Sequence, residues 1–381
     1  MDFALSPEQD QFVAAVRAFA RDRVAPAAAG IDASGDFPRG LVSEAAALGL
    51  AGITVPRDQG GAGRDYVSYT HAMEAIAQAS ATLAVILSVN NSLVVEPLVV
   101  HGTAEQREQW VGRLASGRAI GAFALSEAQA GSDAANQLTT ARADGPDYLI
   151  TGTKVWVANA LVADVAIVFA LTDPSARSRG ISAFLVPLPS PGITTRPTDS
   201  LGMRGLGCLD LELRDVRVPA SALLGEPGRG FRLAMRALEG GRIAIAAQAL
   251  GIGQAALQEA LEYSRRRQAF GQPIGDFQAV QFQLADLATD LEAARMLIWR
   301  AASLHDLTGR AALEAAMAKL HASEAAHRAA DRAMQILASE GYRRGSTVER
   351  LFRDVRAAEI YQGTSEVQRM VIAEKLLDRG R

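Results

Sequence analysis

Near its C-terminus the chain reads EIYQGTSEVQ over residues 359–368. The stretch sets an amide side chain, Gln362, directly before a glycine and two hydroxyl residues. A side-chain amide is not basic enough to accept a proton near neutral pH, so Gln362 cannot act as a general base. Its backbone N–H remains available as a hydrogen-bond donor.

Composition limits the classes of protein to which the chain can belong. Its 381 residues are 49% hydrophobic and 21% charged, as in ordinary globular proteins, and the length predicts two or three domains. A net charge of −3 leaves no electrostatic footprint for nucleic acid. The single cysteine, Cys208, excludes an intrachain disulfide framework.

The chain start and the hydropathy pattern bear on localisation. Residues 1–5 (MDFAL) are acidic and lack the basic and apolar regions of a signal peptide. No uninterrupted apolar run reads as the roughly 20 residues that a membrane span needs. We therefore expect a soluble, cytoplasmic protein with no membrane span.

The hydrophobic period changes twice along the chain. Ser6 and Pro7 open a helix whose apolar face begins at Phe12 and Val16, and helical segments recur to residue 118. Short apolar runs between turn signals then predict a compact antiparallel β domain over 119–228. Helical periodicity returns over 229–381. Helices, then strands, then helices predict an α+β fold with three domains.

Some motifs are decoys. The glycine-rich loop at 56–63 has no P-loop lysine and reads as a turn. The GIGQAA run at 251–256 matches a dinucleotide fingerprint but lies inside a helical segment, so we interpret it as close helix packing. The sequence shows no metal-ligand cluster and no G-x-S-x-G elbow.

Six further motifs occur in order, at residues 123–127 (FALSE), 131–133 (GSD), 154–159 (KVWVAN), 239–242 (EGGR), 267–278 (Arg267, Phe270-Gly271 and Gln278) and 335–339 (QILAS). With the 359–368 stretch they resemble the acyl-CoA dehydrogenases over essentially the whole chain, most closely the short-chain members. The resemblance implies the acyl-CoA dehydrogenase-like α+β fold, with an N-terminal helical domain, a middle antiparallel β domain and a C-terminal helical bundle.

The resemblance also implies ligands and site residues. It implies FAD, bound in one subunit by Phe123, Leu125, Ser126, Ser132, Trp156, Ala158, Thr364, Ser365 and Glu366. It implies that a neighbouring subunit adds Arg267, Phe270, Gln278, Gln335, Leu337, Ala338 and Ser339, so we expect a homo-oligomer, commonly a tetramer arranged as a dimer of dimers. It implies an acyl-CoA thioester held by Ser132, Glu239, Arg242 and Gly363, with the Gln362 N–H stabilising the enolate. The electron acceptor would be an electron-transfer flavoprotein or O₂.

Departures from the family pattern gather around the expected flavin site. Gln362 stands where the family has its catalytic Glu, and Gly241 stands at the second known base position. Ala158 replaces a Thr whose hydroxyl donates to flavin N5. The pairs 128–129 (Ala-Gln) and 338–339 (Ala-Ser) replace Pro-Gly and Gly-Gly.

Three interpretations share this fold, FAD and an acyl-CoA-like ligand. The chain is a divergent flavoenzyme whose base is Glu239 or a substrate group, or which reacts with O₂; or it is a dehydrogenase carrying an engineered Glu→Gln change; or it is a catalytically silent binding subunit. Because several departures cluster at one site, we favour divergence over a single engineered change. The silent subunit ranks last, because the residues that would hold a thioester remain.

Overall fold

The computed structural model describes residues 4–377, so Met1, Asp2 and Phe3 of the chain start considered above lie outside the described residues. The N-terminal helical domain comprises α1 (Pro7–Phe19), η1 (Ala20–Val24), α2 (Ala25–Ser34), α3 (Arg39–Ala47), η2 (Arg57–Gln59), α4 (Tyr66–Ala79), α5 (Ala81–Ser88), η3 (Val89–Val95), α6 (Glu96–His101) and α7 (Ala104–Ala115). The predicted start of α1 is confirmed: the Ser6 hydroxyl accepts from the N–H of Gln9, whose side chain returns the bond as a capping box. The 56–63 loop is a turn around η2.

The expectation that no segment is long and apolar enough to cross a membrane is wrong, because one helix meets both criteria. The continuous helix Ala81–His101, formed by α5, η3 and α6, passes that test. Most of this helix is buried inside the protein, and the core helix of a globular domain has the same length and apolar composition. Sequence inspection missed it because Asn90, Asn91 and Ser92 interrupt the apolar run, and these three side chains are buried.

The middle domain is one sheet whose strands run in the order β6-β7-β3-β2-β4-β5-β8, with β1 also paired to β4. The strands are β1 (Gly121–Ala124), β2 (Thr140–Asp144), β3 (Asp147–Val157), β4 (Val165–Leu171), β5 (Ile181–Pro187), β6 (Ile193–Pro197), β7 (Leu209–Pro219) and β8 (Leu223–Leu224). Most pairs are antiparallel as predicted, but β1 and β2 each pair with β4 in parallel. The segment between β1 and β4 contains the β2–β3 hairpin, and this longer crossover allows a parallel pair.

The C-terminal domain consists of long helices: α8 (Gly230–Arg266), α9 (Gln278–Thr308), α10 (Ala312–Leu337), α11 (Thr347–Ala358) and α12 (Ser365–Leu377). Glycines let α8 approach its neighbours closely. A Cβ atom on Gly251 would lie 2.3 Å from the Glu74 carbonyl oxygen, and one on Gly253 would lie 2.5 Å from a Leu291 methyl. The interpretation of 251–256 as helix packing is therefore confirmed.

The core joins all three domains. Alternate residues of β4 point to opposite sides of the sheet: Val165, Ile167 and Phe169 belong to the large cluster shared with the helices. Ala166 and Val168 belong to a smaller cluster on the other face. The β domain is thereby fixed to the helical body at one face, beside α8.

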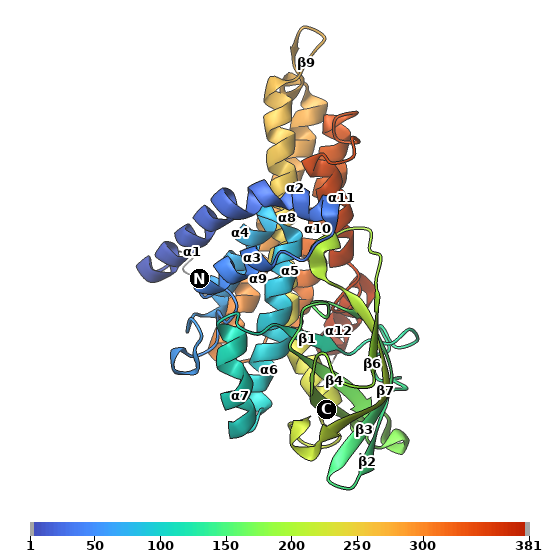
Figure 1. Ribbon diagram of the computed structural model, residues 1–381. Helices are drawn as coiled ribbons and strands as arrows, with labels where there is room; N and C mark the ends of the chain where they lie inside the picture. Colours follow the sequence, from blue (N-terminus) through green and yellow to red (C-terminus); the bar gives the residue numbers. More distant parts are fainter. Residues whose placement is uncertain (1–3, 378–381) are drawn as a thin grey trace.

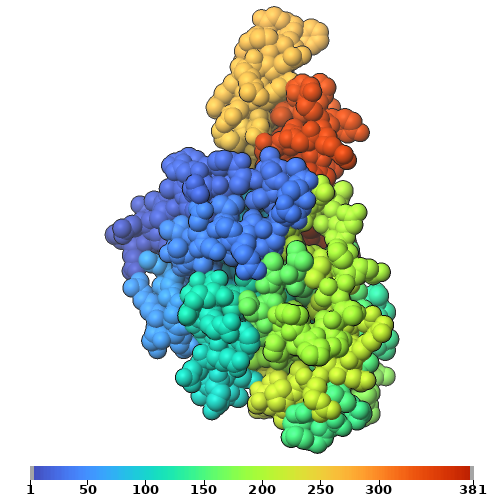
Figure 2. All heavy atoms as spheres, viewed as in Figure 1, coloured from blue at the N-terminus to red at the C-terminus, as the bar shows by residue number. Residues whose placement is uncertain are grey.

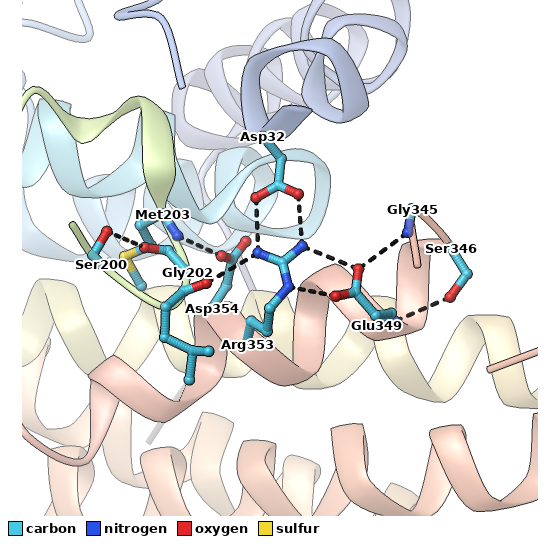
Figure 3. Close-up of polar contacts among 10 residues, drawn as sticks. Asp32, Ser200, Gly202, Met203, Gly345, Ser346, Glu349, Arg353 and Asp354 are labelled. Atoms are coloured by element: carbon cyan, nitrogen blue, oxygen red, sulfur yellow. Dashed lines mark hydrogen bonds and ion pairs between the residues drawn. The ribbon is translucent and has the colours of Figure 1, made fainter. Parts of the chain in front are cut away.

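A polar junction also ties the domains together (Figure 3). Arg353 of α11 makes a bidentate ion pair with Asp32 of α2, at 2.6 and 2.9 Å, and donates to the Leu201 carbonyl oxygen in the β domain. The next residue, Asp354, accepts a 2.6 Å bond from the Met203 N–H. Two consecutive residues of α11 therefore hold segments of both other domains.

The far ends of α8 and α9 project beyond the body (Figures 1 and 2). They are joined by a small hairpin of β9 (Gln268–Ala269) and β10 (Gln272–Pro273). Phe270 at the hairpin turn is 98% exposed. The tip lies at the opposite end of the molecule from the β2–β3 hairpin (Figure 1).

Candidate active site

The 359–368 stretch forms a tight loop between α11 and α12. Gln362 and Gly363 both have left-handed backbones, with φ of 52° and 98°. Such a conformation is costly for a non-glycine residue and persists only where its surroundings hold it. The Ser365 N–H donates to the Glu359 carbonyl oxygen and the Thr364 hydroxyl accepts from the Val367 N–H, which closes the loop and begins α12.

Three side chains hold the loop through its carbonyl groups. Lys319 of α10 donates to the Gly363 oxygen at 2.7 Å, and Arg242 of α8 donates to the Gln362 oxygen at 3.3 Å. Gln368 donates to both, at 2.8 and 3.3 Å. Arg242 was among the predicted substrate residues, whereas Lys319 and Gln368 were not predicted.

Two of these side chains are buried cations. Lys319 is fully buried and Arg242 is 7% exposed. Burial, reinforced by the neighbouring Arg242 charge, lowers the pKa of Lys319 to about 7. Burial also lowers the pKa of Arg242. Within residues 4–377 neither cation makes a salt bridge of 4.0 Å or less.

The Gln362 side chain points at Gly241. A Cβ atom placed on Gly241 would lie 2.3 Å from Gln362 Oε1 and 3.1 Å from a Leu93 methyl. The two positions at which the family carries a base therefore face each other, and neither bears a carboxylate. Gln362 Oε1 is buried and has no hydrogen-bond partner within the described chain.

Glu239 was predicted from the sequence as an alternative base and as a substrate contact. In the structure its carboxylate already accepts a hydrogen bond from within the chain. Its Oε1 accepts from the Ala311 N–H, just before α10 begins. That bond turns its carboxylate toward α10. The proposal that Glu239 serves as the base receives no support from this contact.

The expected flavin loop is organised by a buried ion pair that was not predicted. Lys154 of β3 donates to Glu127 Oε1 at 2.8 Å, to the Gln137 amide oxygen at 2.9 Å and to the Leu125 carbonyl oxygen at 3.1 Å. Glu127 also accepts from two backbone N–H groups, those of Leu138 and Thr139. Burial alone would raise the pKa of Glu127, but Lys154 and these donors outweigh it and lower the pKa to about 2.

The β-domain residues expected to contact FAD surround this ion pair. Leu125 and Ser126 follow β1, and the Val155 N–H donates to the Ser126 carbonyl oxygen. Trp156 sits at a register shift in β3 with φ of 57°, and the residue is 60% exposed. Phe123 and Ala158 are partly buried, and Ser132 is exposed.

A second group of expected FAD residues lies elsewhere. Arg267 caps α8 at the projecting tip, Phe270 is at the hairpin turn, and Gln278 begins α9. Gln335 and Leu337 lie in the last turn of α10, and Ala338 and Ser339 follow it. Arg267 lowers the pKa of Glu340, after the larger effect of Arg343, so the two segments are neighbours. One chain does not bring this group to the β-domain group (Figure 1).

A cleft of about 400 Å³ adjoins the loop, between α10, α11 and α12. It is lined by Glu324, His327, Arg328, Arg356, Glu359, Ile360, Thr364, Ser365 and Glu366. The Ser365 hydroxyl is buried without a partner in the described structure. The two arginines of the cleft are already paired, Arg328 with Asp290 and Arg356 with Glu359. The unpaired hydroxyl and the N-terminus of α12 are the groups left to hydrogen-bond a ligand.

Comparison with known proteins identifies the family of the chain. It matches the N-terminal, middle and C-terminal domains of acyl-CoA dehydrogenase over residues 6–118, 122–216 and 228–377. The chain belongs to the acyl-CoA dehydrogenase family. It is 51% identical to the mitochondrial short-chain specific acyl-CoA dehydrogenase of Bos taurus over 362 residues, which covers 95% of this chain and 88% of that protein.

Solved structures of similar proteins agree with this family assignment. Butyryl-CoA dehydrogenase from Megasphaera elsdenii superimposes with a TM-score of 0.97 at 39% identity, covering 99% of this chain and all of that one. A chain from the structure of the electron transferring flavoprotein of Acidaminococcus fermentans gives the same scores and the same coverage. A glutaryl-CoA dehydrogenase from Mycobacterium smegmatis in complex with FADH2 has a TM-score of 0.93 at 31% identity, covering 99% of this chain and 96% of that one.

The fold, the FAD cofactor and the acyl-CoA oxidoreductase class expected from the sequence are thus confirmed. The acyl-CoA dehydrogenase site fits the cofactor. The exposed Trp156 ring, the loop held by Lys154 and the unpaired Ser365 hydroxyl are groups that FAD would contact. FAD, when bound, supplies the hydride acceptor.

Proposed function

We propose that this acyl-CoA dehydrogenase oxidises the Cα–Cβ bond of a short acyl-CoA thioester with altered chemistry, because no side-chain base stands at the family's two base positions. The observation that carries the proposal is the pairing of Gln362 with Gly241, whose Cβ position lies 2.3 Å from the amide oxygen. The bovine relative, named for short-chain specificity, supports the substrate size.

The backbone supports oxyanion stabilisation. Lys319, Arg242 and Gln368 bind the carbonyl groups of residues 362 and 363 and thereby hold the loop directly after the Gln362 N–H, which itself belongs to the peptide joining Tyr361 to Gln362. In a loop held in this way, the Gln362 N–H would be the donor that stabilises a thioester enolate. This function needs no ionisable side chain at position 362.

The protein works, we propose, as a homo-oligomer that hands electrons to an electron transferring flavoprotein or to O₂. The separation of the two groups of flavin residues supports this. Arg267 ends α8 next to the β9 hairpin and Trp156 lies in β3, and these elements lie at opposite ends of the molecule (Figure 1). A second copy would supply the missing group.

The test is anaerobic stopped-flow reduction of the flavin by butanoyl-CoA, in wild type and in Gln362→Glu. General-base catalysis is worth about 10²–10⁴-fold, so the variant should reduce its flavin faster by that factor. Gln78→Glu, which adds the same charge at an exposed position of α4, is the matched control and should behave as wild type. Equal rates in wild type and Gln362→Glu would overturn the proposal.

A further inference from the structure

We propose that the thioester acted on at this site carries a carboxylate on Cα, as malonyl-type thioesters do, and that loss of CO₂ from Cα forms the enolate in place of proton removal. This inference rests on the proposed function, since it assumes an acyl-CoA held beside Gln362. It adds a substrate class and a source of the enolate that needs no base.

The first observation is uncompensated charge. Lys319 and Arg242 are buried, and their hydrogen bonds within the described chain go to the carbonyl oxygens of Gly363 and Gln362. Buried charges in proteins are normally paired with an opposite charge. The Gln362 amide adds no negative charge to the loop that these two side chains hold.

Nearby carboxylates offset this imbalance only in part. Glu239 acts on the Arg242 charge, but its Oε1 already accepts from the Ala311 N–H. Three others, Glu324, Glu359 and Glu366, act on Lys319 from a distance. Glu324 pairs with Arg369 at 2.7 Å, and Glu359 pairs with Arg356 and with His327. Those two therefore already serve other cations. An anionic group on the substrate, next to the Gln362 loop, would supply the missing charge.

The second observation is the orphaned amide. Gln362 Oε1 is buried against Gly241 and Leu93 with no partner in the described structure. An amide carries a donor and an acceptor end, which exchange by a half-turn of its terminal torsion. Its NH₂ group can donate to a substrate carboxylate, whereas a glutamate at the same position would repel one. The substitution that removes the base also makes the position compatible with an anion.

The chemistry balances without a base. In a 2-carboxyacyl thioester the electrons of the Cα–CO₂⁻ bond pass to the thioester carbonyl as CO₂ leaves, which gives the enolate. Hydride then leaves Cβ for the oxidised flavin. The sum is R–CH₂–CH(CO₂⁻)–CO–SCoA + FAD → R–CH=CH–CO–SCoA + CO₂ + FADH⁻. No proton is taken up or released, and the flavin is the only oxidant.

The first experiment measures binding and decarboxylation without flavin reduction. Neither malonyl-CoA nor acetyl-CoA has a hydrogen-bearing Cβ, so neither can reduce the flavin. Calorimetry on the wild-type holoprotein should show malonyl-CoA binding roughly tenfold or more tighter than acetyl-CoA, as expected for charge-assisted hydrogen bonds. Malonyl-CoA should also release CO₂ and yield acetyl-CoA, with the proton coming from water. Gln362→Glu should lose the preference for malonyl-CoA, whereas Gln78→Glu should keep it.

The second experiment compares 2-carboxybutanoyl-CoA with butanoyl-CoA under anaerobic conditions. The wild type should bleach its flavin with 2-carboxybutanoyl-CoA, releasing one CO₂ per flavin reduced, and do so at least tenfold faster than with butanoyl-CoA. Gln362→Glu should reverse the order. Lys319→Met should weaken the preference for malonyl-CoA. If the Lys319→Met protein does not fold, the comparison of wild type with Gln362→Glu still decides the question.

The outcomes separate this inference from the proposed function. If butanoyl-CoA reduces the wild-type flavin as fast as the carboxylated thioester, the inference is overturned while acyl-CoA oxidation stands. No preference for malonyl-CoA over acetyl-CoA overturns it as well. If neither butanoyl thioester bleaches the flavin in wild type or in Gln362→Glu, the inference and the proposed function both fail.

Discussion

Replacing Lys154 with methionine should destabilise the protein by about 3–5 kcal/mol, the usual cost of breaking a buried ion pair by removing one partner. Lys154 is fully buried, and its ammonium group serves Glu127, Gln137 and Leu125. Methionine fills similar space and leaves the Glu127 carboxylate buried without its cation. Urea unfolding of wild type and variant holoprotein measures the difference as a shift in the midpoint.

The double variant Lys154→Met with Glu127→Gln is the matched control, because an amide keeps an acceptor for the Leu138 and Thr139 N–H groups. It should lose less than the sum of the two single variants. The pair also has an acid signature. The pKa of Glu127 is about 2, below its ordinary 4.5, so its stabilisation is complete above pH 4.5 and is lost as the pH falls toward 2. A loss below about 1 kcal/mol for Lys154→Met, as for a surface pair, would refute the reasoning.

Three further changes are predicted. Arg267→Ala should raise the dissociation constant for FAD about 10–100-fold through a lost charge-assisted bond, measured by flavin release and compared with the exposed neighbour Arg265→Ala; equal retention would contradict it. Ala158→Thr should slow reoxidation of the reduced enzyme by O₂ in stopped-flow, because the hydroxyl would refill space and restore polarity beside the flavin; identical rates would show that residue 158 does not control the reaction with O₂. Asp354→Asn should abolish a loss of stability between pH 4 and pH 6. Burial raises the pKa of Asp354 to about 6, so its ionisation costs folding energy as the pH rises through that window, and urea midpoints at pH 4 and pH 7 that move equally in both proteins would contradict it.

Local signals in the sequence predicted much of the fold. Ser6 with Gln9 gave the start of α1, and the helical setting of Gly251 correctly excluded a dinucleotide loop. These features succeed because each depends on neighbours within a few residues in the chain. The parallel pairing of β1 with β4 could not be predicted from the sequence, because an alternation of apolar and polar residues indicates a strand but not its partner.

The site was less accessible to sequence reasoning. Lys319 lies 44 positions before Gly363, and only tertiary packing shows that it is buried against that carbonyl. Its one local signal is a lysine among the alanines of a buried helix face, at 315, 316, 318 and 322. Glu239 was assigned from its motif, yet a backbone N–H more than seventy residues away determines its orientation.

The absence of a base at position 362 is tested most directly by hydrogen exchange at Cα. Butanoyl-CoA deuterated at C2 is incubated anaerobically with the holoprotein in H₂O, and loss of deuterium is followed by mass spectrometry. Wild type should exchange at least about 10²-fold more slowly than Gln362→Glu, because only the carboxylate can carry the proton away. Equal exchange in the two proteins would show that another group removes the α-proton, and would contradict the account.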